Sequence, residues 1–196
     1  MSIQSYINGE WVSGAESGVQ VSNAVNGKPV GSVSSAGIDF GQSLSYARES
    51  GGHALRAMTF HERANALKAL AQHLMAQKEK FYEVSSWTGA TRVDSWIDIE
   101  GGIATLFSYS SLVRREFPNE HFLVEGEPQI LSKNGTFIGR HILVPKEGVA
   151  VHINAFNFPC WGMLEKIAPS LCAGIPVIVK PATVSAYLTE IMVREI

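Results

Sequence analysis

Two short apolar runs, separated by an amphipathic segment, dominate the second half of the chain. Residues 148–153 (GVAVHI) and 177–179 (VIV) are suited to strands buried on both faces. Apolar residues recur between them at helical spacing: Trp161, Leu164, Ile167, Ala168 and Leu171. Gly174 ends this segment, and Pro169 is expected to kink it. Residues 148–183 therefore predict a βαβ unit, with two neighbouring parallel strands joined by a right-handed crossover helix.

Helical periodicity also marks the first half of the chain. Residues 40–53 predict a short amphipathic helix that ends at Gly51-Gly52. Thr59 and Glu62 have the spacing of a capping box, in which each side chain satisfies a backbone donor near the other. The helix that begins there is expected to run to about Ser85.

A second long helix is predicted over residues 91–117. Asp94 and Asp98 are one turn apart, so their carboxylates are expected to face the same way. Such a pair can do acid–base chemistry or hold a metal, but no His or Cys lies nearby, and acids early in a helix also suit its positive end. Gly101 and Gly102 each cost about 1 kcal/mol relative to alanine inside a helix. A close approach by another backbone or by a ligand would explain these two glycines.

Short strands with glycine turns flank these helices. Asn8-Gly9 and Asn26-Gly27 are hairpin-type turns, which predict a small structural meander at the start of the chain. Residues 118–147 predict a further hairpin, with Asn134-Gly135 between its two strands. Because this hairpin lies outside the βαβ pattern, it is a candidate for contact between subunits.

Composition excludes some classes of partner. The 196 residues carry a net charge of −2 at pH 7, so neither nucleic acid nor a membrane surface is an expected partner. Charged residues make up 17% of the chain, below the usual quarter, which suggests that much of the surface is covered in the native protein. The sequence has no apolar run of 18 residues and no signal peptide pattern.

Cys160 and Cys172 are the only cysteines. On one helix they would lie about 18 Å apart, at roughly 1.5 Å per residue. That separation is far beyond disulfide reach, so a reducing, cytoplasmic location is expected.

Two polar residues mark the turns of the βαβ unit. Asn157 follows the first strand, and Lys180 ends the second. Ligands of parallel sheets bind beyond the carboxyl ends of the strands, where both residues are expected to lie. Neither G-x-G-x-x-G nor G-x-x-x-x-G-K-[ST] is present, so spacing alone predicts an α/β protein with a ligand-binding edge and leaves the ligand open.

These residues resemble motifs of the aldehyde dehydrogenase superfamily. Residues 156–159 (FNFP) resemble its W-N-F-P turn, residues 165–169 (EKIAP) its W-K-x-A-P helix, and residues 180–182 (KPA) the start of its K-P-[AS]-E segment. The 23-residue step from Asn157 to Lys180 also matches. The likeness covers essentially the whole chain and is closest to the phenylacetate-degradation branch, whose members are often fused to an enoyl-CoA hydratase. Residues 8–11 (NGEW) resemble the start of the superfamily, and the closer likeness is carried by residues 55–59, 88–92, 98–102 and 152–159.

The resemblance implies the N-terminal part of an aldehyde dehydrogenase fold: a parallel, Rossmann-like sheet with flanking helices and a protruding β-hairpin. It implies oxidation of a semialdehyde, of the CoA-linked kind that follows aromatic ring cleavage, with NAD or NADP and a thiohemiacetal on a cysteine. Asn157 would donate its amide to the oxyanion, and Lys166 would orient groups near the catalytic centre. The cofactor would contact a further set: Ile153, Asn154, Phe156, Lys180, Ala182 and Thr183. The intact protein would be a homo-oligomer.

Thr183 departs from the family pattern, because many NAD-using relatives have Glu after K-P-A. A carboxylate there would bind ribose hydroxyls and repel a 2′-phosphate. Thr183 removes that repulsion and Lys180 can pair with the phosphate, so NADP is expected to be accepted at least as well as NAD.

In the family, the nucleophilic cysteine and the glutamate that activates water follow the position of Ile196. We therefore expect an N-terminal portion of the enzyme, in three parts. These are residues 1–117 (start of the cofactor domain), 118–147 (hairpin and candidate oligomerisation arm) and 148–196 (first βαβ unit). Cys160 and Cys172 are expected to be buried apolar residues rather than substitute nucleophiles. The alternative is a catalytically incomplete module that binds nucleotide or mediates oligomer contacts.

Overall fold

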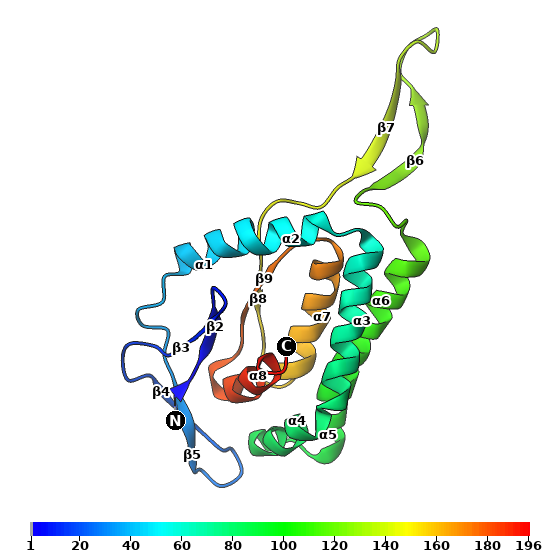
Figure 1. Ribbon diagram of the computed structural model, residues 1–196. Helices are drawn as coiled ribbons and strands as arrows, with labels where there is room; N and C mark the ends of the chain where they lie inside the picture. The colour runs from blue at the N-terminus through cyan, green and yellow to red at the C-terminus, as the bar shows by residue number, and fades with distance from the viewer. Residues whose placement is uncertain (1) are drawn as a thin grey trace.

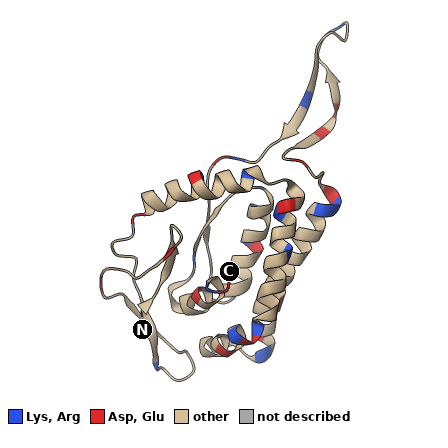
Figure 2. Ribbon diagram, in the orientation of Figure 1, with Lys and Arg blue, Asp and Glu red and all other residues tan. Residues whose placement is uncertain are grey.

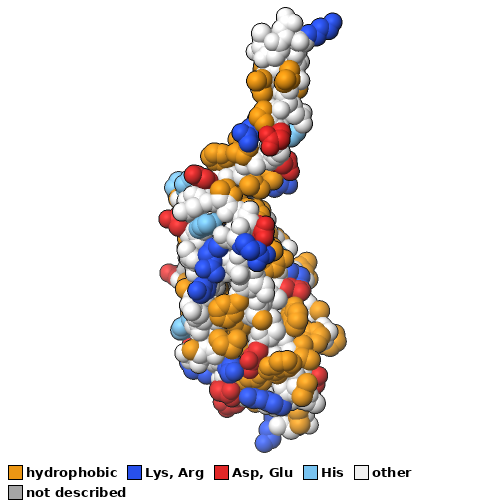
Figure 3. All heavy atoms as spheres, turned by 90° about the vertical axis from the view of Figure 1, so that its right-hand side faces the viewer, with side chains coloured by type: hydrophobic (Ala, Val, Ile, Leu, Met, Phe, Trp, Pro, Cys, Tyr) orange, Lys and Arg blue, Asp and Glu red, His pale blue; other side chains and the backbone are white. Residues whose placement is uncertain are grey.

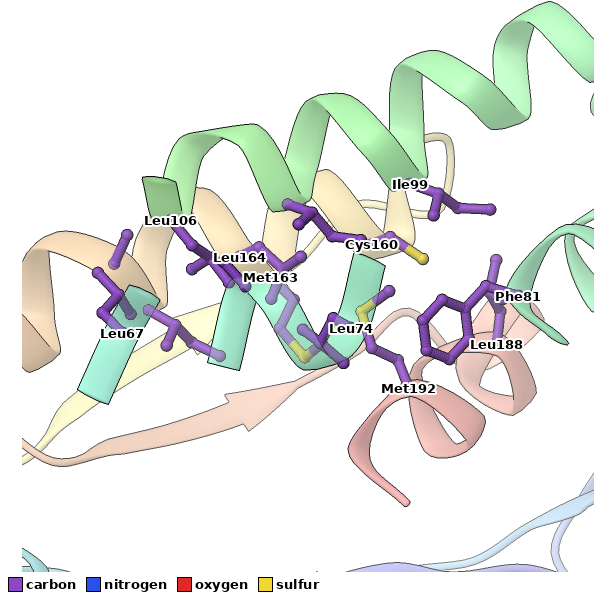
Figure 4. Close-up of a cluster of buried hydrophobic side chains, with 14 of the residues drawn as sticks. Leu67, Leu74, Phe81, Ile99, Leu106, Cys160, Met163, Leu164, Leu188 and Met192 are labelled. Atoms are coloured by element: carbon purple, nitrogen blue, oxygen red, sulfur yellow. The ribbon is translucent and has the colours of Figure 1, made fainter. Parts of the chain in front are cut away.

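Three long helices form the centre of the molecule in the computed structural model, which describes residues 2–196 (Figure 1). They are α3 (Phe60–Ala76), α6 (Gly102–Glu116) and α7 (Pro159–Cys172), and each packs against the other two. A shorter helix, α8 (Ala186–Val193), closes the lower end of the bundle. Figure 4 shows their apolar side chains meeting in one cluster, to which Leu74, Leu106, Leu164 and Met192 contribute.

The predicted βαβ unit is confirmed. Strand β8 (Ala150–Ile153) pairs in parallel with β9 (Val177–Lys180), and α7 connects them. The helix continues through Pro169 to Cys172, and Gly174 follows it with a φ of 79°.

The prediction that these strands are buried on both faces was wrong within residues 2–196. Helix α7 covers one face of the pair, and on the other face Val151 is 60% and Ile153 74% exposed. Two strands with one crossover helix can be covered on one side only, because the second layer of a doubly wound sheet comes from other helices.

The first predicted helix does not end at Gly51-Gly52. Helix α1 (Phe40–Tyr46), a π-helical segment η1 (Ala47–Gly51) and α2 (Gly52–Ala57) follow one another without a break. Gly51 and Gly52 both have right-handed helical φ, −64°. A Cβ at Gly51 would lie 3.1 Å from the ring of Pro176, so close packing explains this glycine better than chain termination does.

The capping box of Thr59 and Glu62 is confirmed at the start of α3. The helix breaks once at Gln77 and continues as α4 (Lys78–Ser85) and the 3-10 turn η2 (Ser86–Thr88). Gly89, with a φ of 87°, ends this region as a left-handed C-terminal residue.

The second long helix is also confirmed. It consists of α5 (Arg92–Trp96), a π-helical segment η3 (Ile97–Gly101) and α6, with Thr91 and Asp94 forming a second capping box. The close backbone approach expected at its glycines is present: a Cβ on Gly102 would lie 2.8 Å from the Cα of Trp161.

The remaining strands form three small sheets. One has the order β1-β5-β4, the second is the β2–β3 hairpin, and the third is the β6–β7 hairpin, which extends away from the helices (Figure 1). Asn8, Gly9, Gly27 and Gly135 all have positive φ at the predicted turns. The bounds are β1 (Ser2–Ile3), β2 (Ser5–Ile7), β3 (Glu10–Val12), β4 (Val19–Ser22), β5 (Pro29–Val33), β6 (Leu123–Ile130) and β7 (Ile138–Leu143).

Positive and negative side chains are interspersed over this fold, and Figure 2 shows no region dominated by one sign. Among residues 2–196, no helix is both long and apolar enough to cross a membrane. The same part of the chain holds no group of three or more metal-ligating side chains.

Candidate active site at the carboxyl ends of the parallel strands

The two predicted site residues lie at the same edge of the strand pair. Ile153, the last residue of β8, is in register with Lys180, the last residue of β9. The backbone N–H of Asn154 then donates to the carbonyl of Lys180 at 3.0 Å. The turn that carries Asn157 therefore begins at the point where Lys180 leaves the sheet, as the strand order requires.

Asn157 lies in the turn between β8 and α7, and its side chain is exposed. Phe156 is 64% and Phe158 40% exposed on either side of it. An exposed amide flanked by aromatic rings can donate to a polar ligand atom whose surroundings are apolar.

Asn154 and Lys166 both lie near Gly162, in the first turn of α7. A Cβ on Gly162 would lie 4.0 Å from the Cβ of Asn154 and 3.9 Å from Nζ of Lys166. Asn154 is only 6% exposed, and within residues 2–196 neither polar atom of its amide has a partner. Nζ of Lys166 donates to the carbonyl of Gly162 at 2.7 Å and contacts Glu165 at 2.9 Å. A buried amide and a half-buried ammonium group thus share one end of α7.

A surface cavity of about 520 Å³, wide open to solvent, is lined by residues of α6, α7 and β8. Within it, Nε2 of His152 lies 3.2 Å from Oγ of Ser170. Burial lowers the pKa of His152, and the charge of Lys166 lowers it further. Lys166 lies in the wall of this cavity, together with Thr105, Tyr109, Trp161, Glu165 and Pro169.

Of the six residues predicted to contact the cofactor, three lie on the exposed surface at the strand ends, two are half-buried and Asn154 is buried. Ile153, Phe156 and Lys180 are exposed, whereas Ala182 and Thr183 are half-buried where β9 leads into the 3-10 turn η4 (Thr183–Ser185). An apolar strand face whose carboxyl edge carries the ammonium group of Lys180, which forms no ion pair within residues 2–196, fits a nucleotide that has an apolar ring and a phosphate or ribose.

Sequence reasoning missed the role of Asp98. Its carboxylate, 3% exposed, accepts the backbone N–H groups of Cys160 and Trp161 at the start of α7, at 3.1 and 2.8 Å. Burial raises the pKa of Asp98, and the donated N–H groups oppose that rise.

The prediction that Asp94 and Asp98 face the same way was wrong. Asp94 is exposed and bonds to Thr91 within its own capping box, whereas Asp98 points into the protein. The capping box decides the direction of Asp94, because its carboxylate turns back to the backbone N–H of Thr91, whereas Asp98 faces the start of α7.

Cys160 is fully buried among core side chains (Figure 4). Burial, and next the charge of Asp98, raise the pKa of its thiol well above the usual value. Cys172 is also buried, and its pKa is raised to about 11. Both are free thiols held in the neutral form, which is the opposite of what a nucleophile needs.

The profile of the aldehyde dehydrogenase family matches residues 11–196. The chain belongs to this family. It is 43% identical, over its whole length, to a 3,4-dehydroadipyl-CoA semialdehyde dehydrogenase from Aromatoleum evansii. It is 27% identical, over 97% of its length, to an NADP⁺ succinate-semialdehyde dehydrogenase from Escherichia coli. It covers 38% and 39% of these relatives, so the chain spans about two fifths of their length.

Solved structures of aldehyde dehydrogenase relatives have the same fold. An NADP-dependent enzyme from E. coli superimposes with a TM-score of 0.78 at 24% identity, over 99% of this chain and 40% of that one. Betaine aldehyde dehydrogenase from Staphylococcus aureus, in complex with NAD⁺, gives a TM-score of 0.78 at 21% identity, over 99% of this chain and 38% of its own. The α/β fold expected from the resemblance is therefore confirmed.

Proposed function

We propose that this chain forms the cofactor-binding and oxyanion-binding part of an NAD(P)-dependent aldehyde dehydrogenase. The observation that carries the proposal is the hydrogen bond from Asn154 N–H to the carbonyl of Lys180. Because this bond joins the start of the Asn157 turn to the strand end that carries Lys180, one ligand edge would serve both the cofactor and the reacting carbonyl.

Asn157 would act on the carbonyl oxygen of the substrate. As a thiol adds to the aldehyde, negative charge develops on that oxygen, and a fixed amide donor stabilises it by about 3–4 kcal/mol. The nicotinamide cofactor supplies the hydride acceptor when it is bound. We assign the attacking thiol to neither Cys160 nor Cys172, because both are buried and neutral.

Lys166 would orient polar groups at the catalytic centre. Its ammonium group and the buried Asn154, whose amide has no partner within residues 2–196, both lie near Gly162. The cofactor would lie across Ile153 and Phe156, with Lys180 at its phosphate or ribose. Ala182 and Thr183 would complete this surface, and the buried Asn154 would support it from beneath.

The substrate we propose is a CoA-linked semialdehyde. The Aromatoleum evansii relative, 43% identical over the whole chain, is named for such a substrate. The cavity beside Lys166 and His152 is polar enough for an acyl group that carries amide or carboxylate functions. Both cysteines are free thiols, which fits the reducing cytoplasm expected from the sequence.

Steady-state kinetics of the full-length protein test this proposal. Asn157→Ala is expected to lower kcat by about 100- to 1,000-fold. The control variant is Asn26→Ala, in the exposed turn between β4 and β5, and it is expected to leave kcat unchanged. The same assay compares cofactors: because Thr183 carries no negative charge, kcat/KM with NADP is expected to equal or exceed that with NAD. Unchanged kcat in Asn157→Ala would refute the oxyanion role, and a strong NAD preference would refute the NADP assignment.

A catalytically incomplete module is the second candidate. The chain spans about two fifths of its relatives, and the thiols of its own two cysteines are neutral and buried. Aldehyde oxidation by residues 1–196 alone, lost in Asn157→Ala, would exclude this candidate.

A further inference from the structure

The first turn of α7 is capped by a residue from another helix. Its own N-cap residue, Phe158, makes no side-chain bond to the helix, and Pro159 at the first position has no N–H to donate. The next two N–H groups, those of Cys160 and Trp161, both donate to the carboxylate of Asp98. Asp98 lies 62 residues before Cys160, so this cap is a tertiary contact.

Two glycines beside Asp98 hold the same turn in place. A Cβ on Gly102 would lie 2.8 Å from the Cα of Trp161, and a Cβ on Gly101 would lie 2.4 Å from its indole ring. We call Asp98, Gly101 and Gly102 the α7 seat. The carboxylate holds the turn by hydrogen bonds to its backbone, and the glycines, which carry no Cβ, let their own helix approach it closely.

We propose that Asp98 is a positioning residue for Asn157, acting through the first turn of α7. Asn157 directly precedes Phe158 and Pro159, so the α7 seat anchors the carboxyl side of its turn. The bond from Asn154 N–H to the Lys180 carbonyl anchors the other side. This inference rests on the proposed function, in which Asn157 donates to the oxyanion.

The requirement for two anchors comes from geometry. A catalytic donor must be held within about 0.5 Å of its productive position, and the Asn157 side chain is exposed, with no burial to hold it. The charge of Asp98 also suits the positive end of α7. Of the two acids in this region, Asp98 alone makes these contacts, because Asp94 bonds within its own capping box.

The test is a double-mutant cycle in the full-length protein. Asp98→Asn keeps the size of the side chain and one acceptor oxygen, but its amide group would face a backbone N–H. We expect kcat to fall roughly 10- to 100-fold, as a misplacement of about 1 Å would cause. The KM for NADP is expected to change much less than kcat, because Ile153 and Lys180, which would contact the cofactor, are held by the strand pair. Asp94→Asn is the matched control and is expected to leave both values unchanged.

The cycle is completed in the Asn157→Ala background. If Asp98 acts through Asn157, Asp98→Asn lowers kcat no further there, because the amide it positions is already absent. Equal losses in both backgrounds, a parallel rise in the KM for NADP, or full activity of Asp98→Asn would each overturn the inference. If Asn157→Ala alone keeps full activity, it is the proposed function that fails. Thermal melting checks folding, and Asp98→Ser, which keeps one acceptor oxygen, replaces Asp98→Asn if that variant does not fold.

Discussion

At the scale of single residues, the two cysteines show how strongly location decides chemistry. Cys160 lies beside Asp98 at a helix N-terminus, where a thiol is often activated, yet it is fully buried and next to a negative charge. Cys172 lies near the guanidinium of Arg63, which lowers its pKa, but burial dominates and the pKa is about 11. Neither position can supply a thiolate near neutral pH.

We therefore expect both thiols to resist alkylation in the folded protein. With a pKa of about 11, Cys172 has about one thiolate per thousand molecules at pH 8, and burial hinders access further. The measurement is peptide mapping by mass spectrometry after iodoacetamide treatment, with and without guanidinium chloride. Fast labelling of Cys160 in the native protein would contradict this prediction, and labelling only after unfolding would confirm it.

At the scale of elements, Gly101 and Gly102 are explained by the helix that packs against them. We expect Gly102→Ala to destabilise the protein by about 1–3 kcal/mol, because its Cβ would lie 2.8 Å from backbone atoms of Trp161 that cannot move away. This cost exceeds the gain of up to about 1 kcal/mol in helix propensity. Denaturant unfolding monitored by circular dichroism gives the free energy of unfolding.

Gly162→Ala provides the matched control for this element. It is also a helical glycine, but its nearest neighbours would lie 3.9 and 4.0 Å from the added Cβ, which is ordinary contact. Alanine there is expected to be neutral or to stabilise the protein by up to about 1 kcal/mol. If both variants shifted stability equally, close packing would not be the reason for the glycine at position 102.

The elements also show how far sequence reasoning reached. Local chemistry predicted the capping box at Thr59, the turn at Asn134-Gly135 and the βαβ unit, since these depend on neighbours in the chain. It failed at Gly51-Gly52, where the helix continues because of packing against Pro176, a residue distant in sequence.

Part of the candidate site could likewise be predicted from the sequence, and part could not. Asn157 and Lys180 could be placed at one edge from strand order alone, and the structure places the turn of one against the other. The cap that Asp98 provides for α7 could not be predicted, because it depends on a contact between residues 62 positions apart in the sequence. The Gly101-Gly102 pair was the one local signal that a partner lay close.

At the scale of the whole molecule, the β6–β7 hairpin is the feature that the helical core does not explain. It extends from the body of the protein, and hydrophobic side chains lie along it below the tip (Figures 1 and 3). Its apolar residues are exposed in the described chain: Ile130, Leu131, Phe137, Ile138, Ile142 and Leu143. A two-stranded hairpin with so much exposed apolar surface is marginal by itself, so a covering surface is expected.

We propose that a second copy of the protein covers this arm. Ile138→Glu, at a position 57% exposed on β7, is expected to lower the oligomeric state or weaken association at least tenfold, because burial would desolvate the introduced charge. Val25→Glu is the matched control, since Val25 is 69% exposed in the turn between β4 and β5. Size-exclusion chromatography with light scattering gives the mass of each variant over a range of concentrations. A monodisperse monomer before any substitution would exclude a subunit-contact role for the arm, and equal effects of the two substitutions would show that its position is not special.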